Sequence, residues 1–332
     1  MGLSIAQRKA LAIVPKVTGV LSMTGSGLII YDILPNRKKR KKTYFRIMCA
    51  MSIFDFVTSF MYALSTWPIP AESGALYASG TEGTCIFQGF FIQLSLAAPL
   101  YNLSLAIYYL LFITYQWKER EIKKLERFLH PAIMVIAFGI AIAGLPLRLY
   151  NNSNVWCWIA PDAADPNRGD NANFYRFALF YVELWFIIIT VTILMSAVVL
   201  TIVRTEMKSA KYAMRSLSLS RQVFIQSVSY VSIFYLSWTF PTTLRILQTI
   251  GTPVPYAIFL CAVIFTPLQG FFNSLVYLKK EGFPFIMPSL ASLARTTVLK
   301  RAVEKGESQH GTSRTGGDDG EQKAEEEGFE NA

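Results

Sequence analysis

The stretch Cys85–Trp117 reads CIFQGFFIQLSLAAPLYNLSLAIYYLLFITYQW and is apolar almost throughout. Polar side chains nevertheless recur in it every seven residues, at Gln88, Ser95, Asn102 and Tyr109. On a helix this interval returns to nearly the same face. Unpaired polar groups are costly in the hydrocarbon of a bilayer, so other helices must cover this face. The stretch therefore predicts a membrane helix at the centre of a bundle.

Six further apolar runs lie along the chain of 332 residues, which is 52% hydrophobic and only 16% charged. Soluble domains carry closer to a quarter of charged residues. Each run reaches the roughly 18 residues that span a bilayer core. We therefore expect an all-α membrane protein, a bundle of seven transmembrane helices at 11–33, 44–67, 86–115, 131–150, 174–203, 224–247 and 253–278.

The ends of the chain differ from this bundle, which would occupy residues 11–280. Residues 1–10 form a short extracellular N-terminus in this interpretation. The spacing of apolar residues in 281–303 permits an amphipathic juxtamembrane helix. Residues 304–332 are polar, acidic and rich in glycine, so we expect a disordered tail.

The net charge of +10 does not indicate nucleic-acid binding, because its placement alternates along the chain. Lysine and arginine crowd the connections 34–43, 116–130 and 204–222, whereas the intervening connections are almost free of them. This bias places the basic connections in the cytoplasm, the N-terminus outside and the C-terminus inside. The protein is then an integral, multi-pass protein of the plasma membrane. Its first basic connection would attract anionic membrane lipids.

Two cysteines fall on the predicted outer side, where disulfide bonds persist. We predict a bond between Cys85 and Cys157 that joins the second outer loop to the top of the third helix. The same loop contains the sequon Asn151-Asn152-Ser153, which predicts glycosylation of Asn151.

Charged residues within or beside the spans indicate functional positions. Asp55 lies midway along the second span, and such an acid should face a partner inside the bundle. Glu183 in the fifth span has two interpretations, a functional acid or a side chain that reaches the interface. Arg148, Arg176 and Arg245 either surround an outer pocket for an anionic ligand or anchor helices among headgroups.

Several kinds of chemistry lack the residues they need. The only histidines, His130 and His310, fall on the predicted cytoplasmic side, which excludes a histidine-based intramembrane metal site. No GxxxxGK[ST] phosphate loop is present. We expect neither an enzyme nor a bound metal or cofactor.

Two motifs resemble a known family. Cys85–Gln93, followed by Leu100-Tyr101-Asn102, is similar to helix three of the slime-mould cyclic-AMP receptors and their plant relatives. Pro267–Ser274 (PLQGFFNS) resembles helix seven of the same receptors. The likeness extends over roughly residues 15–280. It implies a G-protein-coupled receptor that connects an outer ligand to a cytoplasmic heterotrimeric G protein.

The larger rhodopsin-like class offers a looser resemblance. Asp55 resembles its helix-two acid, Trp238-Thr239-Phe240-Pro241 its helix-six switch, and Asn273–Tyr277 (NSLVY) its helix-seven motif. The Asp-Arg-Tyr triplet of that class is missing at the inner end of helix three, where Tyr108-Tyr109-Leu110 stands. In the rhodopsin-like class the arginine of this triplet holds the inner ends of the helices together. Charged residues of 118–127 could take over this contact here.

These observations lead to a receptor whose agonist favours a state with an open cytoplasmic cleft. The alternative is a seven-helix transporter or channel. We expect a polar hub of Asp55, Asn102, Asn273 and Tyr277, with Trp238, Pro241 and Pro267 as switch and hinges. Candidate pocket residues are Gln88, Gln93, Arg148, Arg176, Glu183 and Arg245. Candidate G-protein contacts are Lys118, Arg120, Lys123, Lys124, Arg215 and Arg221.

Overall fold

The computed structural model describes residues 3–162, 165, 167–209 and 217–281. The predicted juxtamembrane helix and acidic tail, from residue 282 onward, lie outside these residues. The principal helices are α1 (Ile5–Ile33), α3 (Thr43–Leu64), α4 (Glu82–Gln93), α5 (Ala97–Tyr109), α6 (Glu119–Ala143), α7 (Ala172–Arg176), α8 (Val182–Ser209), α9 (Leu217–Ile250), α10 (Tyr256–Phe265) and α11 (Gln269–Glu281).

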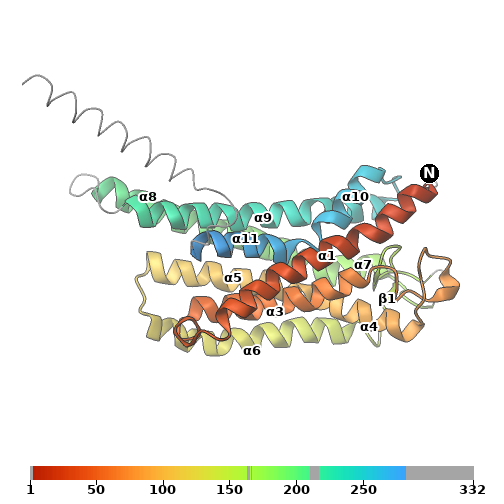
Figure 1. Ribbon diagram of the computed structural model, residues 1–332, viewed down its shortest axis with the longest axis horizontal. Coiled ribbons are helices and arrows are strands. Elements are labelled where there is room, and N and C mark those ends of the chain that lie inside the picture. The colour runs from red at the N-terminus through yellow and green to blue at the C-terminus, as the bar shows by residue number, and fades with distance from the viewer. Residues whose placement is uncertain (1–2, 163–164, 166, 210–216, 282–332) are drawn as a thin grey trace, which may run out of the picture. The chain divides into compact units, whose positions relative to one another are not determined.

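Short elements connect or interrupt these helices. They are the helical turn α2 (Arg37–Arg40), the 3₁₀ turns η1 (Ala71–Ser73) and η2 (Leu94–Leu96), the π-helical turns η3 (Leu110–Thr114) and η4 (Phe177–Tyr181), and the strands β1 (Tyr150–Asn152) and β2 (Cys157–Ile159). The strands pair antiparallel, with Tyr150 opposite Ile159. They form a hairpin at the same end of the bundle as the start of α1 (Figure 1). We call this the hairpin end and the opposite end, where α1 leads into α2, the basic end.

Five helical runs within the described residues are long and apolar enough to cross a membrane: α1, α3, Glu82–Thr114, α6 and Ala172–Thr205. The pair α10 and α11, bent by 51°, would make a sixth. α9, of 34 residues, packs against α8, α10 and α11 as part of the same bundle. The prediction of a helical membrane bundle thus agrees with the fold.

Several predicted helix ends differ from the structure. α1 begins at Ile5 rather than at residue 11, so most of the predicted N-terminal segment is helical, and α9 begins at Leu217 rather than at residue 224. α6 begins at Glu119 rather than at residue 131, and Pro131 lies inside it. It ends at Ala143 rather than at residue 150, because Gly144 and a turn containing Pro146 lead into β1. α3 ends at Leu64, three residues before the predicted end, where Ser65 adopts a positive φ of 50°.

The run Glu82–Thr114 forms the central helix of the bundle. Its stripe is buried, with Gln88, Ser95, Asn102 and Tyr109 between 0 and 7% exposed. The prediction that other helices cover this face is confirmed. Pro99 lacks the backbone N–H that an uninterrupted helix would use, and the 3₁₀ turn η2 lies just before it.

Small residues on α1 let its neighbours approach closely. A β-carbon on Gly19 would lie 2.8 Å from the backbone nitrogen of Ala63 in α3. One on Gly25 would lie 2.9 Å from the Cα of Phe271 in α11. Close backbone packing through small residues is typical of helices in lipid, where apolar burial alone does not favour association.

Candidate functional site

The hairpin of β1 and β2 is held against the central helix at the hairpin end. A disulfide bond joins Cys85 of α4 to Cys157 of β2, as predicted. Gln88, one turn further along α4, accepts a hydrogen bond from the backbone nitrogen of Cys157 over 2.8 Å. The hairpin therefore has both a covalent and a polar attachment to α4.

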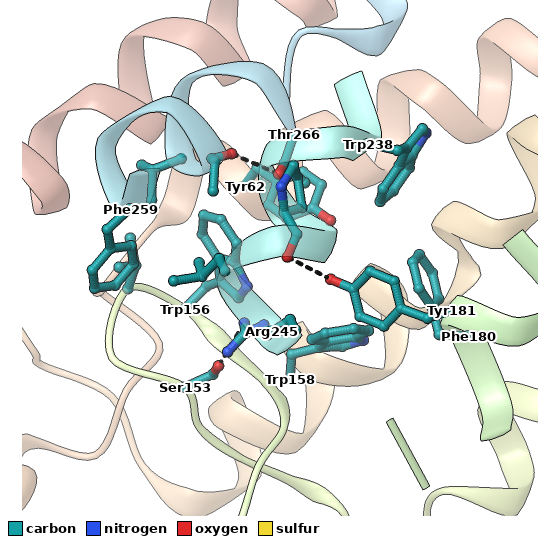
Figure 2. Close-up of a pocket in the computed structure, with 15 residues that line it drawn as sticks. Tyr62, Ser153, Trp156, Trp158, Phe180, Tyr181, Trp238, Arg245, Phe259 and Thr266 are labelled. Atoms are coloured by element: carbon teal, nitrogen blue, oxygen red, sulfur yellow. Dashed lines mark hydrogen bonds between the residues drawn. The ribbon is translucent and has the colours of Figure 1, made fainter. Parts of the chain in front are cut away.

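A small cavity lies beneath this hairpin, between the hairpin and the helical elements α3, η4, α9 and α10 (Figure 2). Its volume of about 30 Å³ leaves room for only one or two water molecules. It is lined by Tyr62, Ser153, Val155, Trp156, Trp158, Phe180, Tyr181, Trp238, Pro241, Leu244, Arg245, Phe259, Ala262, Val263 and Thr266. Aromatic side chains dominate this wall, and Arg245 is its one charged residue.

Arg245 is buried at the edge of the cavity and donates two hydrogen bonds. Its Nη2 donates to the hydroxyl of Ser153 over 3.0 Å, and its Nη1 donates to Gln248 over 2.8 Å. The guanidinium also lies 5.5 Å from the ring centre of Trp158 in β2. Figure 2 shows the arginine reaching from α9 toward the hairpin. A buried arginine bonded to a neutral hydroxyl can accept an anionic partner in its place.

Gln88 and Gln93, predicted to contact a ligand, instead bind the protein itself. The amide nitrogen of Gln88 donates to the carbonyls of Met61 and Ser65, each at 2.9 Å. Gln93 donates to the carbonyl of Leu179 and accepts from the indole of Trp158 at 2.8 Å. Both side chains are at most 1% exposed, and neither lines the cavity. Their assignment to the pocket stays a prediction; in the structure, burial in the bundle pairs each amide with neighbouring segments.

Two of the three predicted pocket arginines also lie elsewhere. Arg148 is exposed in the turn between α6 and β1. Arg176 is buried, but its guanidinium donates twice to the carbonyl of Ile159 in β2, at 2.9 and 2.7 Å. Arg176 therefore attaches the hairpin to α7 and does not line the cavity. Of the three, only Arg245 does.

Glu183 is partly buried near the start of α8 and is not among the cavity residues. One of its carboxylate oxygens is buried without a hydrogen-bond partner among the described residues. Its assignment to the pocket stays a prediction, and the structure favours neither of the two interpretations of this acid.

Asn151 is buried in β1, at 3% exposed, which contradicts the predicted glycosylation. Its amide nitrogen, the atom that a glycan would modify, donates to the carbonyls of Arg148 and Ala160. Its oxygen accepts from Arg168 over 2.6 Å. The sequon pattern indicates a surface loop, but here the segment is a strand enclosed by the turns around it.

The aromatic residues of the hairpin were not identified from the sequence. Trp156 and Trp158 flank Cys157, and both line the cavity with Tyr62 of α3. Trp156 packs edge to face on Tyr62, with ring centres 4.9 Å apart. The sequence did contain an indication of this. A disulfide bond at Cys157 also fixes the positions of its neighbours Trp156 and Trp158 in the bundle.

Of the residues predicted to be switch and hinges, Trp238 and Pro241 line the cavity. Trp238 forms part of the cavity wall, 5.4 Å from the ring of Phe180, and its indole nitrogen is buried without a partner among the described residues. Pro241, one turn along α9, accepts a hydrogen bond from Tyr181 on its carbonyl. Pro267 lies in the break between α10 and α11, where the helical pair bends by 51°.

The predicted polar hub is divided in the structure. Asn273 of α11 donates to the carboxylate of Asp55 in α3 over 2.8 Å, and both side chains are at most 3% exposed. Asn102 is buried in α5, which packs against α3. Tyr277 belongs to a different contact: its hydroxyl donates to Asp32 of α1 over 2.5 Å. Tyr277 lies one helical turn after Asn273, nearer the basic end and away from Asp55.

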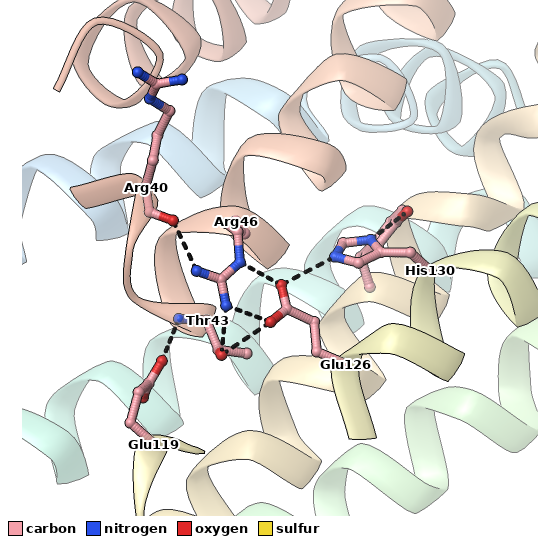
Figure 3. A network of polar contacts seen from close by, with 7 residues as sticks. Arg40, Thr43, Arg46, Glu119, Glu126 and His130 are labelled. Atoms are coloured by element: carbon pink, nitrogen blue, oxygen red, sulfur yellow. Dashed lines mark hydrogen bonds and ion pairs between the residues drawn. The ribbon is translucent and has the colours of Figure 1, made fainter. Parts of the chain in front are cut away.

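A second polar network joins α3 to α6 at the basic end (Figure 3). Glu126 accepts from Arg46 Nε over 2.6 Å and forms an ion pair with the same guanidinium. It also accepts from the hydroxyl of Thr43 over 3.0 Å and contacts His130 at 3.3 Å. His130 in turn bonds to the hydroxyl of Tyr101 in α5. Three helices thus converge on one buried carboxylate.

The spacing of the apolar residues in α6 could have predicted that Glu126 is buried. Ile122, Glu126, Ile133, Ala137 and Ala141 are its buried residues, so the acid interrupts an otherwise apolar face. The predicted partner contacts lie on the opposite side of this segment, where Lys118, Arg120, Lys123 and Lys124 are exposed. Arg215 lies outside the described residues. Arg221 belongs to α9, but its side chain is also outside them.

Comparisons with known proteins point to one receptor family. A family model described as slime mold cyclic AMP receptor matches residues 6–295. Cyclic AMP receptor 2 of Dictyostelium discoideum is 26% identical over 238 residues, which are 70% of this chain and 56% of that protein. The chain therefore spans about half the length of that relative. The relative is named as a receptor and not as an enzyme, which supports the prediction of a non-enzymatic protein.

A solved structure of squid rhodopsin matches with a TM-score of 0.64 and 15% identity. The match covers 87% of this chain and 88% of that chain. At this identity the likeness concerns the fold alone. It agrees with a helical membrane bundle of the rhodopsin kind.

Proposed function

Because the chain belongs to the slime mold cyclic AMP receptor family, we propose that it is a G-protein-coupled receptor for a small, anionic, extracellular ligand. The observation that carries the proposal is Arg245, a buried cation in an aromatic cavity beneath the disulfide-bonded hairpin. In this proposal the hairpin end is extracellular, the basic end is cytoplasmic, and the membrane is the plasma membrane.

The chemistry of the cavity suits a planar anion. Arg245 would supply the charge, and the rings of Trp156, Trp158 and Tyr181 would supply stacking surfaces. Cyclic AMP, named in the relative, combines a flat base with one negative charge and is the first ligand to test. Ligand pockets usually enclose several hundred Å³. A cavity of about 30 Å³ must therefore expand on binding.

Expansion would begin where the hairpin meets α9. An anionic group that approaches Arg245 competes with the hydroxyl of Ser153, which is a weaker, neutral acceptor. If the anion replaced Ser153 as the acceptor for Arg245, the hairpin would lose this contact with α9. The disulfide bond would still hold it on α4. Trp238 and Pro241 lie in the same cavity wall, so the change reaches the middle of α9 directly.

Such a ligand acts by differential affinity for two states of the bundle. Pro267 and Asn273 lie on the bent pair of α10 and α11, and Asn273 connects this pair to Asp55 of α3. The exposed cations Lys118, Arg120, Lys123 and Lys124 would form part of the surface that meets the G protein. Glu126 and Arg46 hold this segment against α3.

The proposal is tested by nucleotide exchange. The purified chain is reconstituted with a heterotrimeric G protein in phospholipid vesicles, and binding of a labelled GTP analogue is followed with and without cyclic AMP and other small anions. A ligand-dependent increase is expected. Substrate flux across the vesicle membrane without any such increase would instead support the transporter or channel alternative. Because coupling is reciprocal, the G protein should also raise agonist affinity.

A further inference from the structure

The connection between α1 and α3 is held at the membrane surface. Only residues 34–42 separate the end of α1 from the start of α3. Both helices are long and apolar enough to cross a bilayer, and they pack along each other. A short connection between two antiparallel spans cannot move far from the headgroups.

This connection has a defined shape. The side chain of Asn36 accepts from the backbone nitrogens of Lys38 and Lys39, which starts the helical turn α2. Lys39 then points back toward α1 and donates to Asp32 over 2.6 Å. At the other end, Arg46 of α3 donates to the carbonyl of Arg40 over 2.7 Å. The backbone is therefore fixed on both sides of α2.

The six consecutive cations of this connection are not equivalent. Lys39 is partly buried and paired with Asp32. The other five, Arg37, Lys38, Arg40, Lys41 and Lys42, are exposed. None of these five forms an ion pair with an acid in the part of the chain that the structure describes. We call them the loop-one cations.

The other described basic segment of this end is different. Its exposed cations, Lys118, Arg120, Lys123, Lys124 and Arg127, share the segment with the acids Glu119 and Glu121. Its charge is thus partly neutralised within the segment itself. Five like charges on one fixed turn repel each other, and this repulsion falls when an anionic surface approaches.

We propose that the loop-one cations form a binding surface for polyanionic phospholipid headgroups of the cytoplasmic leaflet. Basic clusters immediately beside a membrane span attract such lipids, with roughly a fivefold gain in affinity for each cation near the surface. Lys39 is excluded from this surface because it binds Asp32, and it holds the turn in place while its neighbours face outward.

Within the same chain, the acidic residues of 304–332 could compete with the lipid for the loop-one cations. These acidic residues include Glu325, Glu326 and Glu327 in succession. The lipid is favoured because the two spans that border α2 fix the bilayer surface next to it.

The test measures lipid binding by the full-length chain in detergent–phosphatidylcholine micelles, titrated with phosphatidylinositol 4,5-bisphosphate. The test variant carries Lys38→Gln, Lys41→Gln and Lys42→Gln. The matched control carries Lys118→Gln, Lys123→Gln and Lys124→Gln, which removes the same number of exposed lysines from the same end. A third variant carries Glu325→Gln, Glu326→Gln and Glu327→Gln. Thermal unfolding of each variant establishes that it is folded.

We expect the test variant to bind the lipid roughly 100-fold more weakly, at a fivefold loss per charge, and the control to change it by less than fivefold. The binding should also weaken with added salt. Equal losses in the test and control variants would overturn the proposal, since any cation would then serve. It would also be overturned if the unmodified chain bound no lipid while the third variant did, because the tail would then occupy the surface.

Discussion

Arg245 of α9 donates a hydrogen bond to Ser153, which lies in the turn between β1 and β2, over 3.0 Å. The same guanidinium lies over the ring of Trp158. Among the attachments of the hairpin to the bundle, the disulfide bond on α4 is covalent, whereas the contact with α9 depends on a neutral hydroxyl acceptor. The second attachment is the one that an anion can replace.

Arg245→Gln should lower the affinity for an anionic ligand by about 10- to 100-fold, the effect of removing one charged hydrogen bond. Arg148→Gln removes an exposed arginine from the same end of the bundle and should leave affinity within about twofold. Equilibrium binding of a labelled ligand to both variants measures the difference. Equal losses would mean that overall charge, not the cavity, attracts the ligand.

Gln88→Leu should lower stability far more than it alters ligand recognition. The change removes two donated and one accepted hydrogen bond to buried backbone groups, and each unsatisfied group costs about 1–3 kcal/mol. Thermal unfolding in detergent should show the loss. Phe87→Leu, at an exposed position on the same helix, is the control and should change little. An unaltered melting temperature for Gln88→Leu would contradict the assigned role.

The contact between Asp55 and Asn273 can be tested by exchanging the acid and the amide between the two positions. Asn273→Asp places two carboxylates within hydrogen-bond distance and should reduce both stability and ligand-stimulated nucleotide exchange. The double variant Asp55→Asn with Asn273→Asp restores one acid and one amide and should recover part of both. Melting temperatures and exchange rates of the single and double variants measure the coupling. Additive losses would show that the contact carries no coupling.

Glu126→Gln should destabilise the basic end by about 1–3 kcal/mol. The expected cost lies below that of a fully buried ion pair because a quarter of the Arg46 side chain is exposed. G-protein-dependent nucleotide exchange should fall with it, since the first turns of α6 lose their attachment to α3. Arg127→Gln, an exposed neighbour, should leave both unfolding and exchange unchanged. A Glu126 variant with normal unfolding and normal exchange would rule out this role.

Several features could be read from local sequence. Long apolar runs must form helices in a bilayer, because only a helix satisfies its own backbone there. The stripe of Gln88, Ser95, Asn102 and Tyr109 likewise had to be buried, and it is. The pairing of Cys85 with Cys157 followed from their predicted position on one side of the membrane.

The partners of individual polar side chains could not be read in this way. Gln88, Arg176 and Asn151 have the chemistry of ligand contacts or a modification site, yet each binds a carbonyl of a distant or neighbouring turn. Tyr277 has the spacing of the Asp55 hub but contacts Asp32. In each case the partner is the acceptor that tertiary packing brings within about 3 Å. The spacing of residues along the sequence does not specify which acceptor this is.

The chain's hydrophobic and charge patterns were thus enough to predict a helical membrane bundle, its central helix and its disulfide, because these follow from the solvent that each segment must face. The cavity is a product of the tertiary structure. It requires Tyr62, Trp158 and Arg245 from three separate segments to meet. The same holds for Glu126 and Arg46, which are 80 residues apart and become a pair only when α3 packs beside α6.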